Sequence, residues 1–504
     1  MGCLQSSDAP ELRLPNTFLR NLCTHYDGVD VFTRYRVIKE LGTGAFGVVN
    51  QVEALGTNEH FAMKVITIGP NAKLPVLRKE IDLWRGLQHP NIVRLIETYE
   101  SPTHIYMIME LCTGGHLFNA IKSRKEAFPE ATAKLYVRKL AASIHYLHLK
   151  NICHRDIKLE NILYETDCAG AEVKLCDFGA STMFREGVLM QTVLGSVVYM
   201  APEFLEGQYT QACDMWSLGV VMYMLLSNSM PFHGDTEDEI VESIFEAKVI
   251  FDGDSWANVS EDAKRLIQRL LEPDINKRYT ALQVLMHPWV QSADVPLSPA
   301  CQIDDVITRL SEYASFGAMK RAGLLAVAFC CPSIDISDIR RAFDELNVLH
   351  NGVLTIKDLQ QASLTSKYPA VDFAKIFSSL DMENSNQVTF VEFISAVMNP
   401  TTIDETVLRK AYQLFNPDDT KGGIRTDGLA RLLGPDFDQL AVQDMMSVAD
   451  SDHDGAINYE EFVHLIQSRS APRAMSSRRG FGRRSSRSRS TREPQSEVSP
   501  ANKI

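Results

Sequence analysis

Four twelve-residue segments in the last third of the chain place the tightest constraint on its fold. Each lies between stretches with apolar residues at helical spacing, and each has an aliphatic eighth position: Leu354, Val388, Ile424 and Ile457. Aligned on that position, the segments start at residues 347, 381, 417 and 450, a repeat of about 34 residues. This repeat predicts helix–loop–helix units whose loops pair. Residues 334–468 are therefore expected to form an all-α domain of two such pairs.

The fourth segment, DSDHDGAINYEE, has the residue types that bind calcium. Calcium takes about six to eight oxygen ligands, and such a loop supplies them from its first, third, fifth, seventh and twelfth positions, with glycine at the sixth. Gly455 occupies the sixth position. The predicted ligands are Asp450, Asp452, Asp454, the Ala456 carbonyl and Glu461. An acidic surface loop is the alternative, and the helical patterns on both sides disfavour it.

The second segment, DMENSNQVTFVE, is also predicted to bind calcium. Asn386 stands at its turn and tolerates a left-handed backbone better than most residues do. The predicted ligands are Asp381, Glu383, Ser385, Gln387 and Glu392.

The first and third segments lack the full set of ligands that calcium binding needs. Segment 347–358 has Leu349 at its third position and the short Asp358 at its twelfth. Segment 417–428 has Pro417 first, Lys421 fifth and Gly428 last. Both are predicted to be degenerate loops that pair with their neighbours as scaffolding.

Residues 34–290 contain a second set of motifs. GTGAFGVV holds Gly42, Gly44 and Gly47, which let backbone N–H groups approach a polyphosphate. The same spacing occurs in dinucleotide-binding folds and in plain turns, so the context decides. Lys64 follows on a predicted strand, where it can reach the phosphates, and Glu80 on the next helix is its expected ion-pair partner.

The stretches HRDIKLEN and CDFG supply the remaining chemistry of phosphoryl transfer. Asp156 can accept a proton from a hydroxyl, and Lys158 can neutralise the transferred phosphoryl group. Asn161 and Asp177 offer the hard oxygen ligands that Mg²⁺ requires. The motifs APE, DMWSLG and NKRYT complete the series with Glu203, Asp214 and Arg278, where Arg278 is a candidate partner for Glu203.

From Tyr35 to about Val290 this order of motifs resembles a eukaryotic protein kinase, and Lys158 with Ser196 resembles the serine/threonine branch. The resemblance implies a two-lobed α+β fold with a strand-rich small lobe, a larger helical lobe and a hinge near MELCTGG. It also extends the ATP site to a set of further residues: Leu41, Val49, Ala62, Met109, Glu110 and Cys112.

Two positions bear on phosphorylation and on substrate choice. Thr192 lies four residues before Ser196, where many kinases are phosphorylated, and Arg155 is the expected phosphate receiver; an unmodified threonine is the alternative. His116 replaces an acid that related kinases use to hold a substrate arginine. A weaker preference for arginine before the phosphoacceptor is therefore predicted.

A kinase domain followed by a linking segment and four EF-hands resembles the calcium-dependent protein kinases, over Tyr35 to Gln467. In that family the linking segment inhibits the kinase at rest, and the calcium-loaded hands capture it. Residues 291–333 are the corresponding segment; a rigid spacer is the alternative. It has an apolar stripe, basic residues and two interrupting glycines: Ile303, Val306, Ile307, Leu310, Arg309, Lys320, Arg321, Gly317 and Gly323.

The two ends have their own signals. Residues 1–33 are expected to be an irregular arm, and MGCLQS places Gly2 for N-myristoylation and Cys3 for palmitoylation. The Arg/Ser-rich tail 469–504 is too poor in apolar residues to fold alone. It is expected to be a disordered tail, with anionic lipid binding and a nuclear address as the alternatives.

The composition excludes some classes of protein. A formal charge of −13 argues against a general nucleic-acid binder, and ten scattered cysteines without a disulfide framework indicate a reducing compartment. We therefore expect a protein of the cytoplasm and the cytoplasmic face of membranes. Its expected activity is calcium-activated transfer of the ATP γ-phosphoryl to protein serine and threonine, with Mg²⁺. The alternatives are a calcium-sensing scaffold with a silent kinase fold and a kinase that calcium no longer controls.

Overall fold

The computed structural model describes residues 17–468, apart from 45–46, 70–73, 169, 186, 192–195, 293–302, 332–335, 366–370, 383, 417–421 and 435–437. Gly2, Cys3, Thr192, Glu383 and the tail 469–504 therefore lie outside the described residues. Among the helices that are described, none combines the length and the apolar character that crossing a membrane requires.

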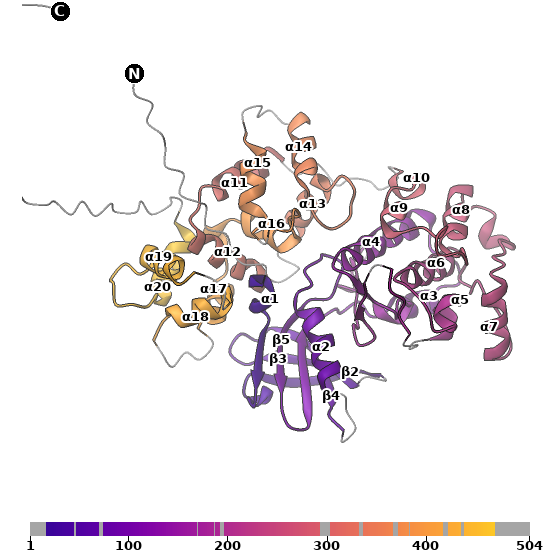
Figure 1. The fold of residues 1–504 in the computed structure, drawn as a ribbon, viewed down its shortest axis with the longest axis horizontal. Coiled ribbons are helices and arrows are strands. Elements are labelled where there is room, and N and C mark those ends of the chain that lie inside the picture. Colours follow the sequence, from indigo (N-terminus) through magenta and orange to yellow (C-terminus); the bar gives the residue numbers. More distant parts are fainter. Residues whose placement is uncertain are drawn as a thin grey trace, which may run out of the picture. The chain divides into compact units, whose positions relative to one another are not determined.

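The small lobe, drawn in indigo and violet in Figure 1, is built on one six-stranded sheet with the order β1-β5-β6-β4-β3-β2. Its strands are β1 (Thr24–Asp27), β2 (Tyr35–Gly44), β3 (Gly47–Ala54), β4 (His60–Thr67), β5 (Leu95–Glu100) and β6 (His104–Met109). Strands β2 to β6 are paired in antiparallel fashion, whereas β1 runs parallel to β5. Helix α2 (Leu74–Arg85) packs beside β5, and the Trp84 indole donates a 2.8 Å hydrogen bond to the Val93 carbonyl.

The expectation of an irregular N-terminal arm is wrong for residues 17–27, which form helix α1 (Phe18–Leu22) and strand β1. Phe18, Leu19 and Leu22 are fully or almost fully buried. A helix of five residues is not stable alone, so packing must supply its stability, and α1 contacts helix α18 (Thr426–Leu433) of the third hand. This is why the sequence of the arm shows no sustained period.

The large lobe surrounds helix α6 (Ala212–Ser227), which is buried along nearly its whole length. Helix α4 (Glu130–Leu149) packs against it. The remaining helices are α3 (Leu117–Ser123), α5 (Pro202–Leu205), α7 (Glu237–Glu246), α8 (Glu261–Leu270), α9 (Ala281–Leu285) and α10 (Pro288–Gln291). Two short antiparallel strand pairs hold the loops of the site: β7 (Ile152–Cys153) with β10 (Thr182–Met183), and β8 (Ile162–Tyr164) with β9 (Val173–Leu175).

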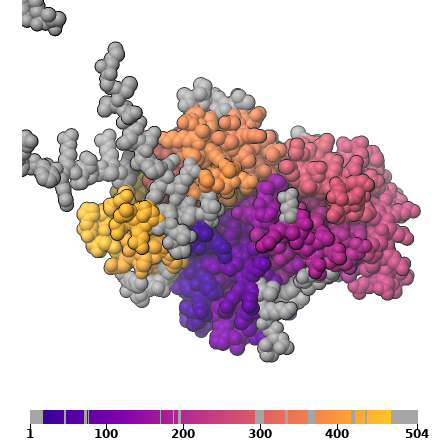
Figure 2. Space-filling model, in the orientation of Figure 1, coloured from indigo at the N-terminus to yellow at the C-terminus, as the bar shows by residue number. Residues whose placement is uncertain are grey.

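The four repeats form four helix–loop–helix hands, as the sequence predicts. Their helices are α13 (Ser337–Leu346) and α14 (Ile356–Thr365), α15 (Phe373–Leu380) and α16 (Phe390–Val397), α17 (Glu405–Phe415) and α18 (Thr426–Leu433), and α19 (Gln439–Ala449) and α20 (Tyr459–Gln467). The first and second loops pair through Leu354 and Val388, and the third and fourth through Ile424 and Ile457. The aliphatic eighth position thus joins the hands in two pairs, coloured orange and yellow in Figure 2.

The linking segment contributes two helices, α11 (Ile303–Tyr313) and α12 (Ala318–Cys330), and both lie against the hands. Val306, Ile307 and Leu310 are buried where α11 contacts α15 and α16. Gly317 is the N-cap of α12 and so marks the break between the two helices. Inside α12, a Cβ on Gly323 would lie 2.6 Å from the Ile466 side chain, so this glycine permits a close approach of α20. The whole molecule is α+β, with a mixed small lobe and helical parts after it.

Candidate active site and calcium loops

The loop between β7 and β8 brings together three of the predicted catalytic residues. Asp156 Oδ2 lies 2.8 Å from Lys158 Nζ and accepts a 2.8 Å hydrogen bond from Asn161 Nδ2. Both Asp156 and Asn161 are buried. The carboxylate is therefore held in one orientation before any substrate arrives, which is what a general base requires.

Asp214, at the start of α6, fixes the backbone of this loop. Its carboxylate accepts hydrogen bonds from the N–H groups of His154 (2.9 Å) and Arg155 (2.8 Å), and His148 Nε2 lies 2.9 Å from it. Burial opposes ionisation of Asp214, but the His148 hydrogen bond and these donors outweigh it and leave the carboxyl pKa below its usual value. The negative charge that orients the loop is thus retained.

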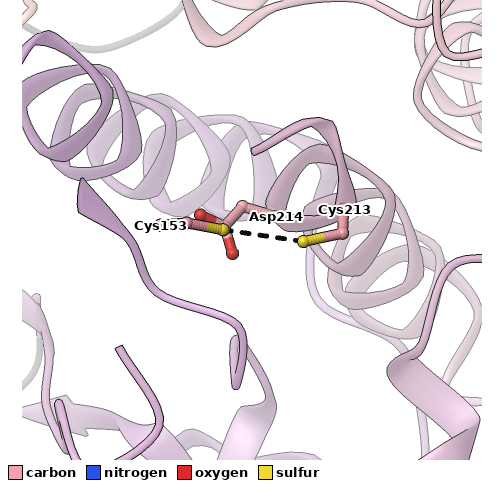
Figure 3. Close-up of side chains that lie close together, drawn as sticks. All are labelled: Cys153, Cys213 and Asp214. Carbon is pink, nitrogen blue, oxygen red and sulfur yellow. Dashed lines mark hydrogen bonds between the residues drawn. The ribbon is translucent and has the colours of Figure 1, made fainter. Parts of the chain in front are cut away.

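Two cysteines lie beside Asp214, as Figure 3 shows. The Sγ atoms of Cys153 and Cys213 are 3.6 Å apart, and both side chains are buried. Burial raises the pKa of both thiols, so they stay protonated. The Asp214 oxygens already accept hydrogen bonds from other groups. The two cysteines therefore pack in the core beneath the loop, as expected for a protein of a reducing compartment.

Asp177 and Lys64 meet across the site. Lys64 Nζ lies 2.6 Å from Asp177 Oδ1, which also accepts a hydrogen bond from the Gly179 N–H. Burial opposes ionisation of Asp177, but the Lys64 ammonium outweighs it and lowers the pKa of the carboxyl. Asp177 has a left-handed backbone (φ 62°), a conformation that costs about 1–3 kcal/mol and that the surrounding structure must hold.

The predicted ion pair between Lys64 and Glu80 is not present in this structure, because Lys64 is paired with Asp177. Glu80 forms no salt bridge with a described residue. Both side chains line one cavity of about 460 Å³ between β4, α2 and Phe178. Burial raises the pKa of the Glu80 carboxyl to about 7, an effect that the nearby Arg155 and Lys64 only partly offset. Glu80 therefore lies in the same cavity as Lys64 but does not form the expected ion pair with it.

The glycine-rich hairpin joins β2 and β3, with Gly42 opposite Val49 and Gly44 opposite Gly47. Gly47 has φ +133°, and a Cβ there would lie 2.0 Å from the Val65 carbonyl oxygen. Strand packing therefore requires glycine at this position, independently of any contact with phosphate.

Two residues of the predicted ATP site lie where β4 and β6 pair. Ala62 is opposite Met109, and both are buried, whereas Leu41 is exposed and Cys112 is half-buried. The Glu110 side chain has another role, because its carboxylate lies 2.6 Å from Lys174 Nζ.

The donors of this site suit a magnesium-bound nucleotide. The Asn161 amide and the Asp177 carboxylate are oxygen donors of the kind that Mg²⁺ takes, and the Lys64 ammonium is a cation for phosphate.

The large lobe also contains His116 and the predicted Glu203–Arg278 pair. His116 Nδ1 lies 2.6 Å from the Glu160 carbonyl oxygen. Arg278 contacts both Glu203 oxygens, at 2.5 and 2.9 Å, in a buried bidentate pair. Arg155, the expected receiver of a phosphate, donates hydrogen bonds to the Ala180 carbonyl and to the Tyr209 hydroxyl. The weaker preference for substrate arginine stays a prediction.

The fourth loop gathers its predicted ligands. The carboxylates of Asp450, Asp452 and Asp454 lie within 4.8 Å of one another. Gly455 has φ +86°, and Asp450 Oδ1 is buried without a hydrogen-bond partner. Buried carboxylate oxygens without donors fit a cation. Glu461 Oε1 accepts a hydrogen bond from the Ser451 N–H (2.7 Å), so the twelfth loop position lies beside the second.

The second loop has a similar arrangement. Asp381 accepts hydrogen bonds from the Ser385 and Asn386 N–H groups, both at 2.8 Å, and Asn386 has φ +60° as predicted. Glu392 is buried and accepts from the Met382 N–H (3.1 Å), while the Gln387 carbonyl accepts from the Ser385 hydroxyl.

The end of helix α17 crowds the twelfth position of the third loop. A Cβ on Gly428, at its twelfth position, would lie 2.2 Å from the Phe415 carbonyl oxygen. A carboxylate therefore has no room at this position.

Comparison with known proteins agrees with both halves of the chain. Residues 35–290 match the model of the protein kinase domain, and residues 441–469, around the fourth loop, match that of the EF hand domain. The chain is 32% identical over 471 residues to calcium-dependent protein kinase 19 of Oryza sativa subsp. japonica, covering 91% of this chain and 86% of the relative. It is 32% identical to calcium-dependent protein kinase 34 of Arabidopsis thaliana (87% and 85% covered). It is 31% identical to calcium-dependent protein kinase 3 of Plasmodium berghei (85% and 79% covered).

These matches extend over both the catalytic and the calcium-binding parts of the chain. The cofactors of the two parts are ATP with Mg²⁺ and Ca²⁺. The chain therefore belongs to the calcium-dependent protein kinase family, as a calcium-regulated serine/threonine protein kinase.

Proposed function

We propose that calcium binding to the second and fourth hands switches on phosphoryl transfer to serine and threonine of protein substrates. The observation that carries this proposal is the cluster of Asp156, Lys158 and Asn161 in one site with the Lys64–Asp177 pair. A scaffold with a silent kinase fold has no need to keep both of these groups of side chains.

Each residue has a role that follows from its position. Asp156 accepts the proton of the substrate hydroxyl, and Lys158 beside it balances the charge of the transferred group. Bound Mg²⁺ would neutralise the charge that develops on the transferred group. Asn161 and Asp177 would hold the metal, and Lys64, once released from Asp177, would orient the phosphates.

Control by calcium requires a difference between two states of the kinase. We infer that Lys64 pairs with Glu80 in the active state and with Asp177 at rest, since both carboxylates lie near it. The linking segment supplies the inhibition at rest. Its helices α11 and α12 bury their apolar faces against the hands in this structure, so calcium binding to the hands would act directly on the elements that hold this segment.

Incorporation of labelled phosphate into a general protein substrate tests the function. We expect full activity with calcium and only a few per cent of it with a chelator. Equal activity in both conditions would instead identify a kinase that calcium no longer controls. No activity in either condition, with ATP and Mg²⁺ present, would identify a scaffold.

We also propose that acylation of Gly2 and Cys3 places the kinase on the cytoplasmic face of membranes. One acyl chain gives only marginal binding, so both modifications are needed for stable attachment. Gly2→Ala is expected to move most of the protein to the soluble fraction, and Cys3→Ser to do so in part. Ser7→Ala, which lies outside the motif, is the matched control. Cell fractionation that gives the same distribution for all four proteins would refute the proposal.

A further inference from the structure

The first hand contacts the catalytic domain through the turn of its loop. Gly352, at the sixth loop position, has φ +79°, and a Cβ there would lie 1.7 Å from His89 Nε2. His89 belongs to the segment before β5, and burial lowers the pKa of its imidazole to about 3. The ring is therefore neutral at physiological pH, and the loop turn packs directly on it. Only a glycine allows this contact.

Helix α13 of the same hand adds a charged contact. Arg340 is 6% exposed, and its Nη2 lies 3.2 Å from Glu165 Oε1 on the large lobe. Its Nη1 lies 3.8 Å from Glu172. Glu165 is in turn 3.2 Å from Lys174 Nζ, which pairs with Glu110 at the hinge. The guanidinium thus joins a buried charge network that runs from the first hand to the segment between the lobes.

The shape of the first loop is maintained by its own side chains. Asp358 accepts hydrogen bonds from the N–H groups of Val348 (3.1 Å) and Thr355 (2.7 Å). Asn347 Oδ1 accepts one from the Asn351 N–H (3.2 Å). These bonds satisfy groups of the loop backbone, and Leu349 offers no oxygen at the third position. The loop therefore keeps its turn, and its fit to His89, without an ion.

We propose that the first hand has become a calcium-independent docking module for the catalytic domain. Arg340 is its anchor on Glu165 and Glu172, and the turn at Gly352 is its contact with His89. A ligand shifts an equilibrium only by binding its two states differently, and this loop has no calcium site of its own. The first hand therefore stays docked at rest and during activation, while calcium acts on the other hands.

Amide hydrogen exchange of the full-length protein, with calcium and with a chelator, tests this inference. The informative peptides cover residues 86–93 of the catalytic domain and 348–354 of the loop. In the wild type we expect the same slow exchange in both conditions. Arg340→Glu should speed exchange in both peptides by about tenfold or more, since a buried charge pair becomes a repulsion of like charges.

The neighbouring arginine provides the matched control. Arg341 is exposed and pairs with Asp338 of its own helix, so Arg341→Glu should leave exchange unchanged. Adding Glu165→Arg to Arg340→Glu should restore slow exchange in part, which a merely unfolded hand would not do. Fast exchange of the wild type in chelator would overturn the inference, as would equal behaviour of the Arg340→Glu and Arg341→Glu proteins. Hydrogen exchange does not depend on phosphoryl transfer, so this test remains informative even if the proposed activity is not found.

Discussion

Asp156→Asn is expected to lower the rate of phosphoryl transfer by about two to four orders of magnitude, the usual contribution of a general base. The side chain keeps its size, so the contacts with Lys158 and Asn161 limit any structural change. Asp177→Asn should have an effect of at least similar size, because it weakens a metal ligand and the partner of Lys64. Both rates are measured as labelled phosphate transferred per enzyme with saturating calcium.

Asp167→Asn is the matched control, since Asp167 is an exposed aspartate in a turn of the same lobe. It should retain normal activity. Thermal unfolding of all three proteins should give similar midpoints, which separates loss of chemistry from loss of fold. If Asp156→Asn and Asp177→Asn both turned over at near the normal rate, neither residue would have the catalytic role assigned to it.

Glu461→Gln is expected to raise the calcium concentration for half-maximal kinase activity by about tenfold or more, within the range of typical coupling energies. Glu461 accepts from the Ser451 N–H and so joins the two ends of the fourth loop. The amide has one oxygen where the carboxylate has two and lacks its charge, so it is a weaker ligand. Glu392→Gln in the second loop should have the same effect, and the double variant should show almost no response.

Glu460→Gln is the matched control, because Glu460 is exposed and adjacent to Glu461. Its calcium titration should coincide with that of the wild type. Direct calcium binding, measured by calorimetry on the same proteins, shows whether each loop has lost its ion. A double variant with unchanged calcium sensitivity would mean that these loops are not the switch.

Features encoded by local spacing could be predicted from the sequence. The fourth loop is one example, because Asp450, Asp452, Asp454 and Gly455 lie within six positions of one another and act through the same turn. The four hands and their pairing followed from the aliphatic eighth position. The catalytic cluster was also predictable, since Asp156, Lys158 and Asn161 belong to one short loop.

Features that depend on distant contacts could not be predicted. Helix α1 is too short to show a period, and it is ordered by burial of Phe18 and Leu22. The partner of Lys64 is Asp177, 113 residues further along the chain, and no local pattern marks this contact. The contact of Gly352 with His89 links residues far apart in the chain, and no local pattern marks it.

Strand β1 has a consequence for where the catalytic part of this protein begins. The match to the kinase model starts at residue 35, whereas β1 covers the edge of β5 from Thr24 to Asp27. A shortened protein that starts at Tyr35 would present β5 as a bare strand edge. Bare strand edges are a known cause of aggregation. The smallest soluble catalytic fragment should therefore retain the residues from Thr24 onward.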